Sequence, residues 1–536
     1  MHLGLDVGTG TTKLTRYQSG TRHASRMLIV PTAVSYQGLS SRIPAASPGG
    51  EPPSDSVRCD GFPAMLGEWP ATRVTAWGGR TPGEVAQTFL RRLLIRGTDE
   101  DVPRADSLVV TVPATGPYPA AKGSLRDSGT ELLEILYAIG YPPQRVLPAP
   151  VAALAFLQHE YPELTDATRF AVCDVGAGGM SFALCTSTAT GARIIDVLRM
   201  TGAAAWNQDT MPGTATDGRP VTLTEGLVAE MARIGGAPAA APGDGRSVHR
   251  WRALEAALAS AGEEESPGYE LRKAFWAGGK HPGFGGLRFA DLEVTGVQVF
   301  QACARLAEAA GAGLSSVLAR QEDPEWRRFG ADATRIVLIG GLTGLGPIRA
   351  ALLQAAGLDA REARLDAREA GHVVVEPGPV DRLCTAALGA ALIAAGKADP
   401  STRFPYAVRL LVYRAVQDRI EPGFVQIAAA GTIVSDQAET PVKGADGRPV
   451  VVTVPVSSAG LPLAAALPIQ LVPREATSPQ PAEFKPAPNP PPGDYRISVA
   501  GDPAGAAIVL RHVRENRMLR YVLRLPEGPH QAEGIA

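Results

Sequence analysis

The sequence lacks the features that would assign it to several classes of protein. Its five cysteines are scattered, with no CxxC pair and no Cys/His cluster, which argues against a disulfide framework and a zinc site. The 52 Lys and Arg nearly balance the 54 Asp and Glu, so no footprint for nucleic acid or an anionic membrane surface is present. The apolar runs are too short to span a bilayer. We therefore expect neither nucleic acid nor a membrane as a partner.

Several catalytic and targeting motifs are missing as well. No GxxxxGK[ST] loop and no GxSxG elbow occur, and the eight histidines show no metal-ligand spacing. The first residues have no charged segment followed by an apolar one, so a signal peptide is not predicted. These absences favour a cytoplasmic protein that is not a P-loop NTPase or an α/β-hydrolase.

The composition of the 536 residues is that of a globular protein, with 45% apolar and 20% charged residues, and the length predicts two to four domains. Strand-like and helix-like patterns alternate through residues 1–398. After a linker at residues 399–405, β-type alternation takes over in residues 406–536, which predicts a small all-β domain. Residues 474–493 are rich in proline and predict an exposed loop within that domain.

Local signals predict several elements of the first part. Thr81, Pro82 and Glu84 form a capping box with proline at the first helical position, so a helix is expected to begin there. Further helices are expected near residues 124–140, 150–159, 221–235, 249–262, 293–320, 346 onward and 380–396. Buried strands are expected at residues 107–113 and 336–340, and two strands are expected within residues 170–200.

Three glycine-rich segments are the most informative feature. They are residues 3–14 (LGLDVGTGTTKL), residues 170–184 (FAVCDVGAGGMSFAL) and residues 335–348 (RIVLIGGLTGLGPI). In each, an apolar β-like run leads into a glycine turn. Two Asp-Gly turns that face each other can hold phosphates and a metal ion from both sides, and a third glycine turn can hold a nucleoside.

The first segment has the groups that phosphates and Mg²⁺ require. Gly8 and Gly10 allow backbone N–H groups to approach phosphate oxygens closely, and Lys13 can place a positive charge against them. Asp6 would hold Mg²⁺ through water, because Mg²⁺ dehydrates reluctantly. Hydroxyl donors come from Thr9, Thr11 and Thr12. The alternative is a hairpin whose glycines only form a tight turn.

The other two segments extend this pattern. After Asp174, the second segment continues with Gly176, Ala177, Gly178 and Gly179, and a simple hairpin turn is again the alternative. The third segment has Gly340, Gly341 and Leu342 after a buried strand and before a helix, where backbone can lie against a ribose or a base. Its glycine spacing does not match the GxGxxG of dinucleotide-binding folds.

On these residues the chain resembles the actin/Hsp70/sugar-kinase ATPase superfamily, and Hsp70-type chaperones most closely. The first two segments look like the phosphate-1 and phosphate-2 motifs, and the third looks like the adenosine motif. Residues 111–114 (TVPA) resemble an Hsp70 strand, and residues 138–155 and 381–395 resemble the two connecting segments. The glycine and lysine spacing of the first segment is nearer to actins and carbohydrate kinases than to standard Hsp70.

The resemblance implies an α/β fold with two lobes, each built on a five-stranded ribonuclease-H-like sheet, and ATP or ADP with Mg²⁺ in the cleft. It places Asp6, Asp174 and Asp381 around the metal. It assigns Asp6, Asp174 and Lys13 to catalysis, and the residues of the three glycine turns to nucleotide binding. Glu270 and Lys273 have the spacing with which Hsp70 brackets adenine and ribose; a surface ion pair is the alternative.

The chain also departs from the Hsp70 pattern. The acidic residue of the first connecting segment corresponds to Ala149, and two polar positions of phosphate-2 correspond to Gly179 and Ser181. No lysine occurs between Lys13 and Lys122, so Arg73 and Arg80 are the candidates to replace the Hsp70 catalytic lysine. Because phosphoryl transfer depends on positioning water and neutralising charge, we expect ATP binding with weak hydrolysis.

Three functions remain open at this point. The first is an Hsp70-like, nucleotide-switched chaperone whose β-domain binds unfolded polypeptide or a partner protein. The second is a small-molecule kinase of the sugar-kinase branch, which the position of Lys13 suggests. The third is a non-catalytic scaffold or assembly protein with an actin-like fold, which the missing carboxylate at Ala149 favours.

Overall fold

The computed structural model of the chain divides into two compact units. Unit 1 comprises Met1–Gly116, Leu125–Ser187 and Ile194–Pro400; unit 2 comprises Pro117–Ser124, Thr188–Arg193 and Ser401–Ala536. The structure describes residues 1–21, 23–38, 40–44, 56–66, 74, 77–96, 105–114, 128–161, 164, 169–188, 191–206, 214–216, 219–259, 287–329, 334–358, 373–398, 406–416, 419–428, 440–443, 447–454, 469–473, 482–484, 490–502, 505–515, 517–524 and 534–535.

The first sheet of unit 1 is mixed and has five strands in the order β3-β2-β1-β7-β8. Its strands are β1 (His2–Val7), β2 (Thr11–Tyr17), β3 (Ser25–Pro31), β7 (Ser107–Val112) and β8 (Arg145–Pro148). The central strand β1 pairs antiparallel with β2 and parallel with β7. In this register Asp6 lies opposite Lys13 on one side and Thr111 on the other, which brings all three to one end of the sheet.

The second sheet of unit 1 repeats this arrangement. Its order is β11-β10-β9-β14-β15, and its strands are β9 (Arg169–Val175), β10 (Gly179–Thr188), β11 (Gly191–Thr201), β14 (Thr334–Ile339) and β15 (Val374–Val375). The central strand β9 pairs antiparallel with β10 and parallel with β14. Both central strands end in the sequence Asp-Val-Gly, at Asp6 in β1 and at Asp174 in β9.

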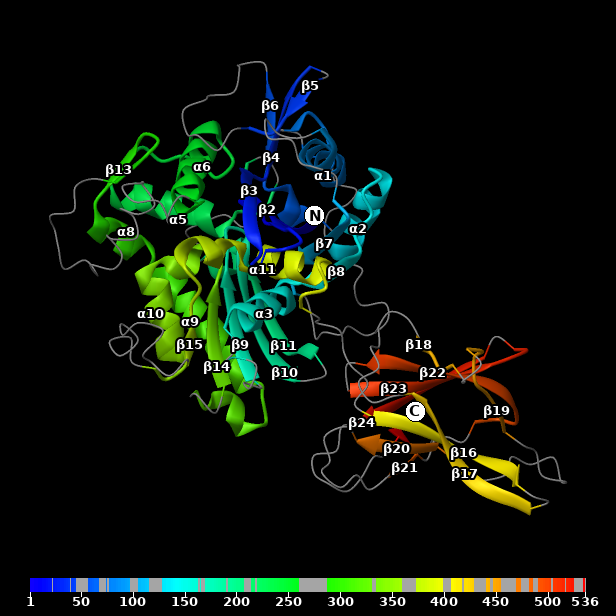
Figure 1. The fold of residues 1–536 in the computed structure, drawn as a ribbon. Helices are drawn as coiled ribbons and strands as arrows, with labels where there is room; N and C mark the ends of the chain where they lie inside the picture. The colour runs from blue at the N-terminus through cyan, green and yellow to red at the C-terminus, as the bar shows by residue number, and fades with distance from the viewer. Residues whose placement is uncertain are drawn as a thin grey trace. The chain divides into compact units, whose positions relative to one another are not determined.

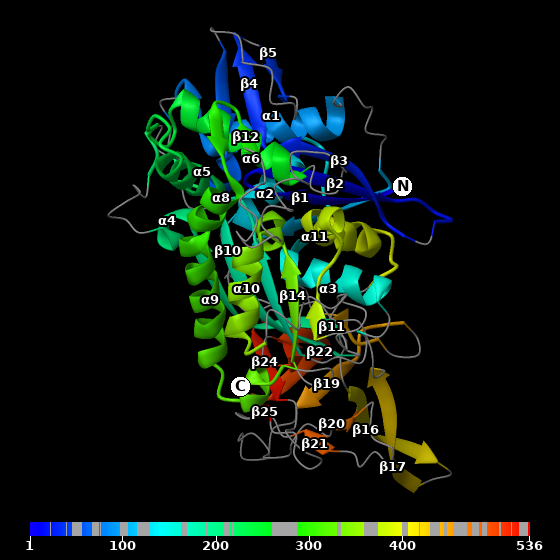
Figure 2. The ribbon, with the colours of Figure 1, turned by 90° about the vertical axis from the view of Figure 1, so that its left-hand side faces the viewer.

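Two helices pack closely against each other between the sheets, α3 (Ala149–Glu160) and α11 (Pro379–Ala394), and α11 also lies on β1, β2 and β7 (Figures 1 and 2). The approach depends on two glycines. A Cβ on Gly389 would collide with the backbone oxygen of Ala152 in α3, and a Cβ on Gly4 would collide with the backbone of α11 at Ala387. Small residues therefore set the spacing between the sheets and these helices.

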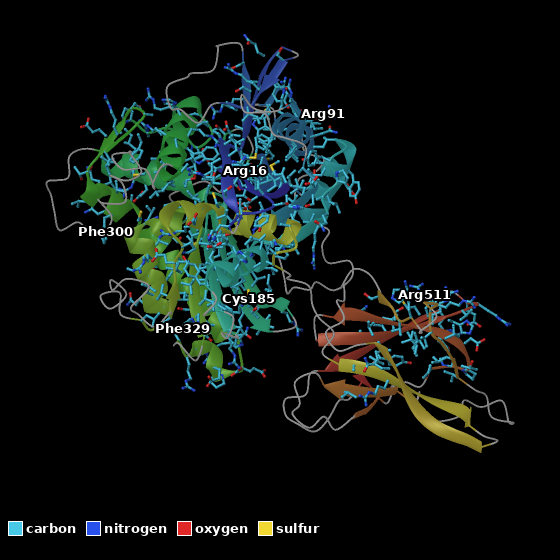
Figure 3. The ribbon with its side chains drawn as sticks, in the orientation of Figure 1. Arg16, Arg91, Cys185, Phe300, Phe329 and Arg511 are labelled. Atoms are coloured by element: carbon cyan, nitrogen blue, oxygen red, sulfur yellow. The ribbon has the colours of Figure 1, made fainter. Side chains whose placement is uncertain are left out.

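Each of the two five-stranded sheets of unit 1 has its own hydrophobic core. Around the second sheet, α9 (Ala304–Ala319) packs on α10 (Gly346–Ala355), and α5 (Leu223–Ile234) packs on α6 (Gly245–Ala259). Cys185 of β10 is fully buried, whereas Phe300 of α8 (Gly296–Ala302) is 37% exposed (Figure 3).

The first core carries a small three-stranded sheet of β4 (Ala33–Gln37), β5 (Ser40–Arg42) and β6 (Val57–Asp60), together with α1 (Pro82–Arg91) and α2 (Ser128–Ala138). The predicted capping box at the start of α1 is confirmed. The Thr81 hydroxyl accepts from the Glu84 N–H at 3.2 Å, and the Glu84 carboxylate accepts from the Thr81 N–H at 2.7 Å. The helix then continues as a π-helical turn over Arg92–Arg96.

The described part of unit 2 is built from strands, in agreement with the predicted change to β structure. One sheet has the order β17-β16-β20-β21, and the other has the order β18-β22-β23-β24-β25 with β19 also paired to β22. These strands are β16 (Tyr406–Val416), β17 (Arg419–Ala428), β18 (Thr440–Pro441), β19 (Val451–Val454), β20 (Ile469–Pro473), β21 (Ala482–Phe484), β22 (Gly493–Asp502), β23 (Gly505–His512), β24 (Met518–Arg524) and β25 (Gly534–Ile535).

Three expectations from the sequence need correction. Residues 170–200 contain three strands rather than two, because residues 176–178 form a turn of their own between β9 and β10. Residues 293–320 hold the end of β13 (Leu292–Val294), α8 and α9 rather than one helix. Within the proline-rich segment, β21 pairs with β20, because the four consecutive residues 482–485 are free of proline. No described helix is long and apolar enough to cross a membrane.

Candidate functional site

A cavity of about 160 Å³ in unit 1 is lined by all three glycine segments. It lies where the central strands β1 and β9 end and where β14 leads into a 3-10 turn (Gly341–Gly344). The predicted site residues that line it are Asp6, Gly8, Thr9, Gly10, Thr11, Lys13, Asp174, Gly176, Ala177, Gly178, Gly179, Gly340, Gly341 and Leu342. Segments more than 150 residues apart in the sequence therefore meet in one place.

A lysine and a carboxylate form an ion pair in the cavity wall. Lys13 Nζ lies 3.0 Å from Asp6 Oδ2, and the two side chains are 12% and 20% exposed. The hydroxyl of Thr111 donates to the other oxygen of Asp6 at 2.9 Å. Because both carboxylate oxygens accept a hydrogen bond, Asp6 is held in a fixed orientation toward the cavity.

Burial and neighbouring charges both shift the pKa values of Lys13 and Asp174. Burial lowers the pKa of Lys13, but the charge and hydrogen bond of Asp6 outweigh it, and the net pKa is raised. For Asp174, burial raises the pKa to about 6, with a further contribution from the charge of Asp6, while Lys13 acts in the opposite sense. The cavity thus contains an ammonium group that stays charged and a carboxylate that titrates near neutral pH.

The raised pKa of Asp174 gives the first testable prediction. Replacing Asp174 with asparagine is expected to raise the free energy of unfolding at about pH 8 by about 1–3 kcal/mol, because the charged carboxylate is disfavoured in the folded protein. The proton on Asp174 contributes stability below the unfolded-state pKa of 3.8, and this contribution is lost as the pH rises through about 6. Urea unfolding of both proteins across this range measures the difference in the free energy of unfolding. The difference should vanish at about pH 4, close to the unfolded-state pKa of Asp174. A pH-independent difference would contradict the assignment.

The three turns contact one another closely. A Cβ on Gly178 would collide with the side chain of Thr9, and a Cβ on Gly10 would lie 2.8 Å from the Cβ of Ala177. In the third turn Gly340 has φ +86°, and a Cβ there would lie 2.5 Å from a carboxylate oxygen of Asp174. Glycine is required at these positions because any side chain would push the turns apart.

Three of the predicted or candidate site residues do not line the cavity: Thr12, Asp381 and Arg80. Thr12 is fully buried and its hydroxyl lies 2.8 Å from that of Thr32, so it supports the first turn from behind. Asp381 is exposed in the first turn of α11 and does not line the cavity, so the structure does not bring it together with Asp6 and Asp174. Arg80 stacks on Tyr36 at 4.0 Å and donates to the Trp77 carbonyl, and it also does not line the cavity.

Glu270, Lys273 and Arg73 lie outside the described residues. The same holds for the predicted linker at residues 399–405. The four residues of the TVPA segment, 111–114, all line the cavity. Ala149 lines it too, at the start of α3.

Several lining residues were not predicted from the sequence. Glu255 of α6 is 7% exposed, and one of its carboxylate oxygens has no hydrogen-bond partner among the described residues. Arg199 of β11 lines the cavity and is exposed, and Arg382 of α11 lines it while pairing with Glu376 at 2.6 Å. No local motif marks these residues, because only the packing of distant elements brings them to the cavity.

The cavity lining contains two carboxylates and a lysine, the types of group that could hold a polyphosphate with Mg²⁺. Within the described ranges, no group of three or more His, Cys, Asp and Glu side chains could hold a metal ion. Asp6 and Asp174 are two carboxylates at the ends of the two central strands, and Mg²⁺ in proteins is usually bound by one or two carboxylates, several waters and substrate phosphates. Lys13 adds the positive charge that phosphate oxygens require.

Comparison with known proteins does not assign the chain to a family. A search of protein-family models gave no match, and a search of curated proteins gave no significant match. The function of the site must therefore be inferred from the geometry of the chain itself.

Proposed function

We propose that the cavity binds a nucleotide such as ATP together with Mg²⁺. In this proposal the first two glycine turns and Lys13 contact the phosphates, and the third turn contacts the nucleoside. The observation that carries it is the meeting of two equivalent Asp-Val-Gly turns, from the central strands of two similarly ordered sheets, with a third glycine turn in one cavity. Hairpin turns that served only to reverse the chain would have no reason to converge.

The proposal extends to an actin-like arrangement of two lobes in unit 1. Its support is the repeated strand order. In the first sheet, β3–β2 and β2–β1 pair antiparallel, and β1–β7 and β7–β8 pair parallel. In the second sheet, the central strand β9 likewise pairs antiparallel with β10 and parallel with β14. The position of α3 and α11 between the sheets is a further point in favour, since the superfamily connects its lobes through two such helices.

The charged residues of the cavity would have different roles in binding. Asp6 and Asp174 would hold Mg²⁺ through water, and the metal would neutralise phosphate charge. Lys13, already oriented by Asp6, would face the phosphate oxygens. Glu255, beside Gly10, adds a third carboxyl group to the lining, and burial raises its pKa.

Hydrolysis is expected to be weak. Turnover requires side chains that position and activate water. Ala149 and Gly179 line the cavity at two places where the resemblance implies polar groups, and neither has a functional side chain. Removing such groups affects turnover more than binding, so we propose a nucleotide-binding protein with slow ATPase activity.

A chaperone-like function is the further part of this proposal. The strand-rich unit 2 would bind polypeptide, and the nucleotide state of unit 1 would control that binding. Its support is the strand-rich class of unit 2 and the position of residues 406–536 after unit 1, which is what the resemblance to Hsp70 would imply. Release of a bound unfolded peptide on addition of ATP would test it.

A methyl group placed in the cavity tests nucleotide binding. Gly176 lines the cavity, lacks a left-handed φ, and a Cβ there would meet nothing within 4 Å. Gly176→Ala is therefore expected to leave the melting temperature unchanged but to weaken Mg²⁺-ATP binding by about tenfold, the usual effect of one misplaced methyl group. Calorimetric titration and thermal unfolding measure the two quantities.

Gly245→Ala is the matched control. A Cβ on Gly245 would also meet nothing within 4 Å, and this glycine has no left-handed φ, but it does not line the cavity. We expect this variant to match the wild type in both measurements. Equal ATP affinity of all three proteins would place the ligand away from Gly176 and contradict the proposal.

A further inference from the structure

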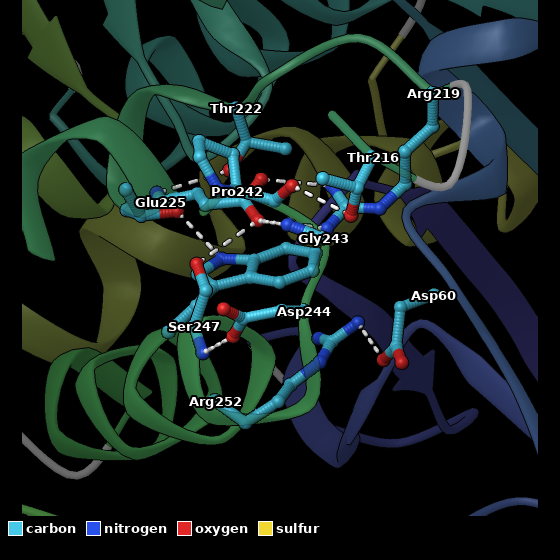
Figure 4. Close-up of polar contacts among 12 residues, drawn as sticks. Asp60, Thr216, Arg219, Thr222, Glu225, Pro242, Gly243, Asp244, Ser247 and Arg252 are labelled. Carbon is cyan, nitrogen blue, oxygen red and sulfur yellow. Dashed lines mark hydrogen bonds and ion pairs between the residues drawn. The ribbon is translucent and has the colours of Figure 1, made fainter. Parts of the chain in front are cut away.

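An arginine outside the cavity holds the first glycine turn from behind. Arg252 of α6 is 10% exposed, and its guanidinium donates to the carbonyl oxygen of Gly10 at 2.8 Å. The same guanidinium forms an ion pair with Asp60, the last residue of β6 (Figure 4). Neither Arg252 nor Asp60 is among the described residues that line the cavity. One side chain thus links α6 and β6 to the turn.

Further contacts hold both partners of the Arg252–Asp60 ion pair in place. Asp60 is 4% exposed and also accepts from Arg58 at 3.0 and 3.2 Å. Burial raises the pKa of Asp60, but the charges of Arg252 and Arg58 outweigh it, so the pKa is lowered and the carboxylate stays charged. The Arg252 guanidinium stacks on the indole of Trp251 at 4.1 Å. Arg252 is therefore restricted to one orientation.

A second buried ion pair anchors the helix that carries Arg252. Arg219 forms two hydrogen bonds with Glu225, at 2.8 and 2.9 Å, and both side chains are almost fully buried. Glu225 also accepts from the Gly243 N–H at 2.9 Å, just before α6 begins (Figure 4). Arg219 lies 4.9 Å from the ring of Trp251. The start of α6 is therefore fixed by buried, hydrogen-bonded charges.

These contacts determine which way the peptide groups of the turn face. The Gly10 carbonyl accepts from Arg252 and from the Thr32 N–H at 3.0 Å, and the Gly8 carbonyl accepts from the Thr32 hydroxyl at 2.6 Å. In a trans peptide the N–H points opposite to the C=O. The N–H groups of Thr9 and Thr11 are consequently turned away from Arg252 and Thr32, and both residues line the cavity.

We propose that Arg252 and Asp60 are positioning residues that hold the first glycine turn in a phosphate-binding conformation. This inference rests on the proposed function and deepens it, because it names the part of the ligand that depends on the pair, the phosphates. An ion pair outside the cavity thereby determines how tightly the cavity binds a phosphorylated ligand and leaves the nucleoside contacts of the third turn unaffected.

The test compares ATP with adenosine in the full-length chain. Arg252→Met keeps a side chain of similar length beside Trp251 but removes the donors to Gly10 and Asp60. We expect it to weaken Mg²⁺-ATP binding by about tenfold or more, as for loss of a charged hydrogen bond, while adenosine binding changes by less than about twofold. Calorimetric titrations with each ligand give both values.

Arg250→Met is the control for a purely structural effect. Arg250 lies on the same helix, is 1% exposed and pairs with Asp291 at 2.6 Å, away from the turn. We expect this variant to lose stability but to keep the wild-type ratio of ATP to adenosine affinity. If Arg252→Met does not fold, Asp60→Asn replaces it, because it weakens the same pair without changing side-chain size; the expected effect has the same sign.

The outcomes separate this inference from the proposed function. Selective loss of ATP affinity in the Arg252 or Asp60 variant supports it. An equal loss of affinity for ATP and adenosine, or an unchanged ATP affinity, overturns the positioning role of Arg252 and Asp60. Neither result contradicts the proposal that the wild-type cavity binds a nucleotide. Absence of ATP binding in the wild type overturns the proposed function and this inference with it.

Discussion

Replacing Lys13 with methionine is expected to weaken Mg²⁺-ATP binding by about a hundredfold or more, because a partly buried ammonium forms strong charge-assisted hydrogen bonds with phosphate oxygens. Lys13 lines the cavity and is already oriented by its ion pair with Asp6 at 3.0 Å. Methionine fills a similar space but has no charge and no donor. Calorimetric titration of the wild type and the variant with Mg²⁺-ATP measures the effect.

The same substitution leaves Asp6 without its counter-ion, so stability must be measured alongside binding. Loss of one partner from a buried pair is strongly destabilising. The double variant Asp6→Asn/Lys13→Met removes both charges and is expected to recover part of the lost stability without recovering ATP binding. A Lys13→Met protein that binds ATP as tightly as the wild type would exclude Lys13 from the phosphate site.

The second large effect is expected at the contact between α3 and α11. Gly389→Ala should lower the free energy of unfolding by about 2–3 kcal/mol, the upper part of the usual range for overpacking, because the added methyl group meets the backbone of Ala152 rather than a movable side chain. This loss should exceed the gain of about 1 kcal/mol from the better helix propensity of alanine. Urea unfolding followed by circular dichroism measures the change.

Gly311→Ala in α9 is the matched helical control. Its Cβ would lie 3.3 Å from the backbone oxygen of Ala351 in α10, a tight contact that a small shift can relieve. We expect its free energy of unfolding to lie within about 1 kcal/mol of the wild type, since the gain in helix propensity offsets the crowding. Two variants of equal stability would show that α3 and α11 can separate without cost, contrary to the close packing of these two helices.

Local sequence patterns were sufficient to locate the turns but not every group around them. The segments containing Asp6, Asp174 and Gly340 could be identified because each combines a buried strand with a glycine turn. The capping box at Thr81 could be identified because its hydrogen bonds join residues three apart. In all these cases the determining contacts lie within a short stretch of chain.

Residues that reach the cavity through long-range packing could not be predicted. Glu255 and Arg252 lie three residues apart in α6 and so share one face, but which face meets the first glycine turn depends on how α6 packs on α5. Arg199 lies in β11, and it reaches the cavity only through the packing of that strand in the second sheet. Asp381 was placed at the metal by resemblance alone, and the path of α11 keeps it away from the cavity.

The most direct test of the central claim is calorimetric titration of the full-length wild-type protein with Mg²⁺-ATP, in parallel with Lys13→Met. We predict saturable binding of one ATP per chain to the wild type and a loss of that binding in the variant. The absence of binding to the wild type, or equal binding to both proteins, would contradict the assignment of the three converging glycine turns to a nucleotide site.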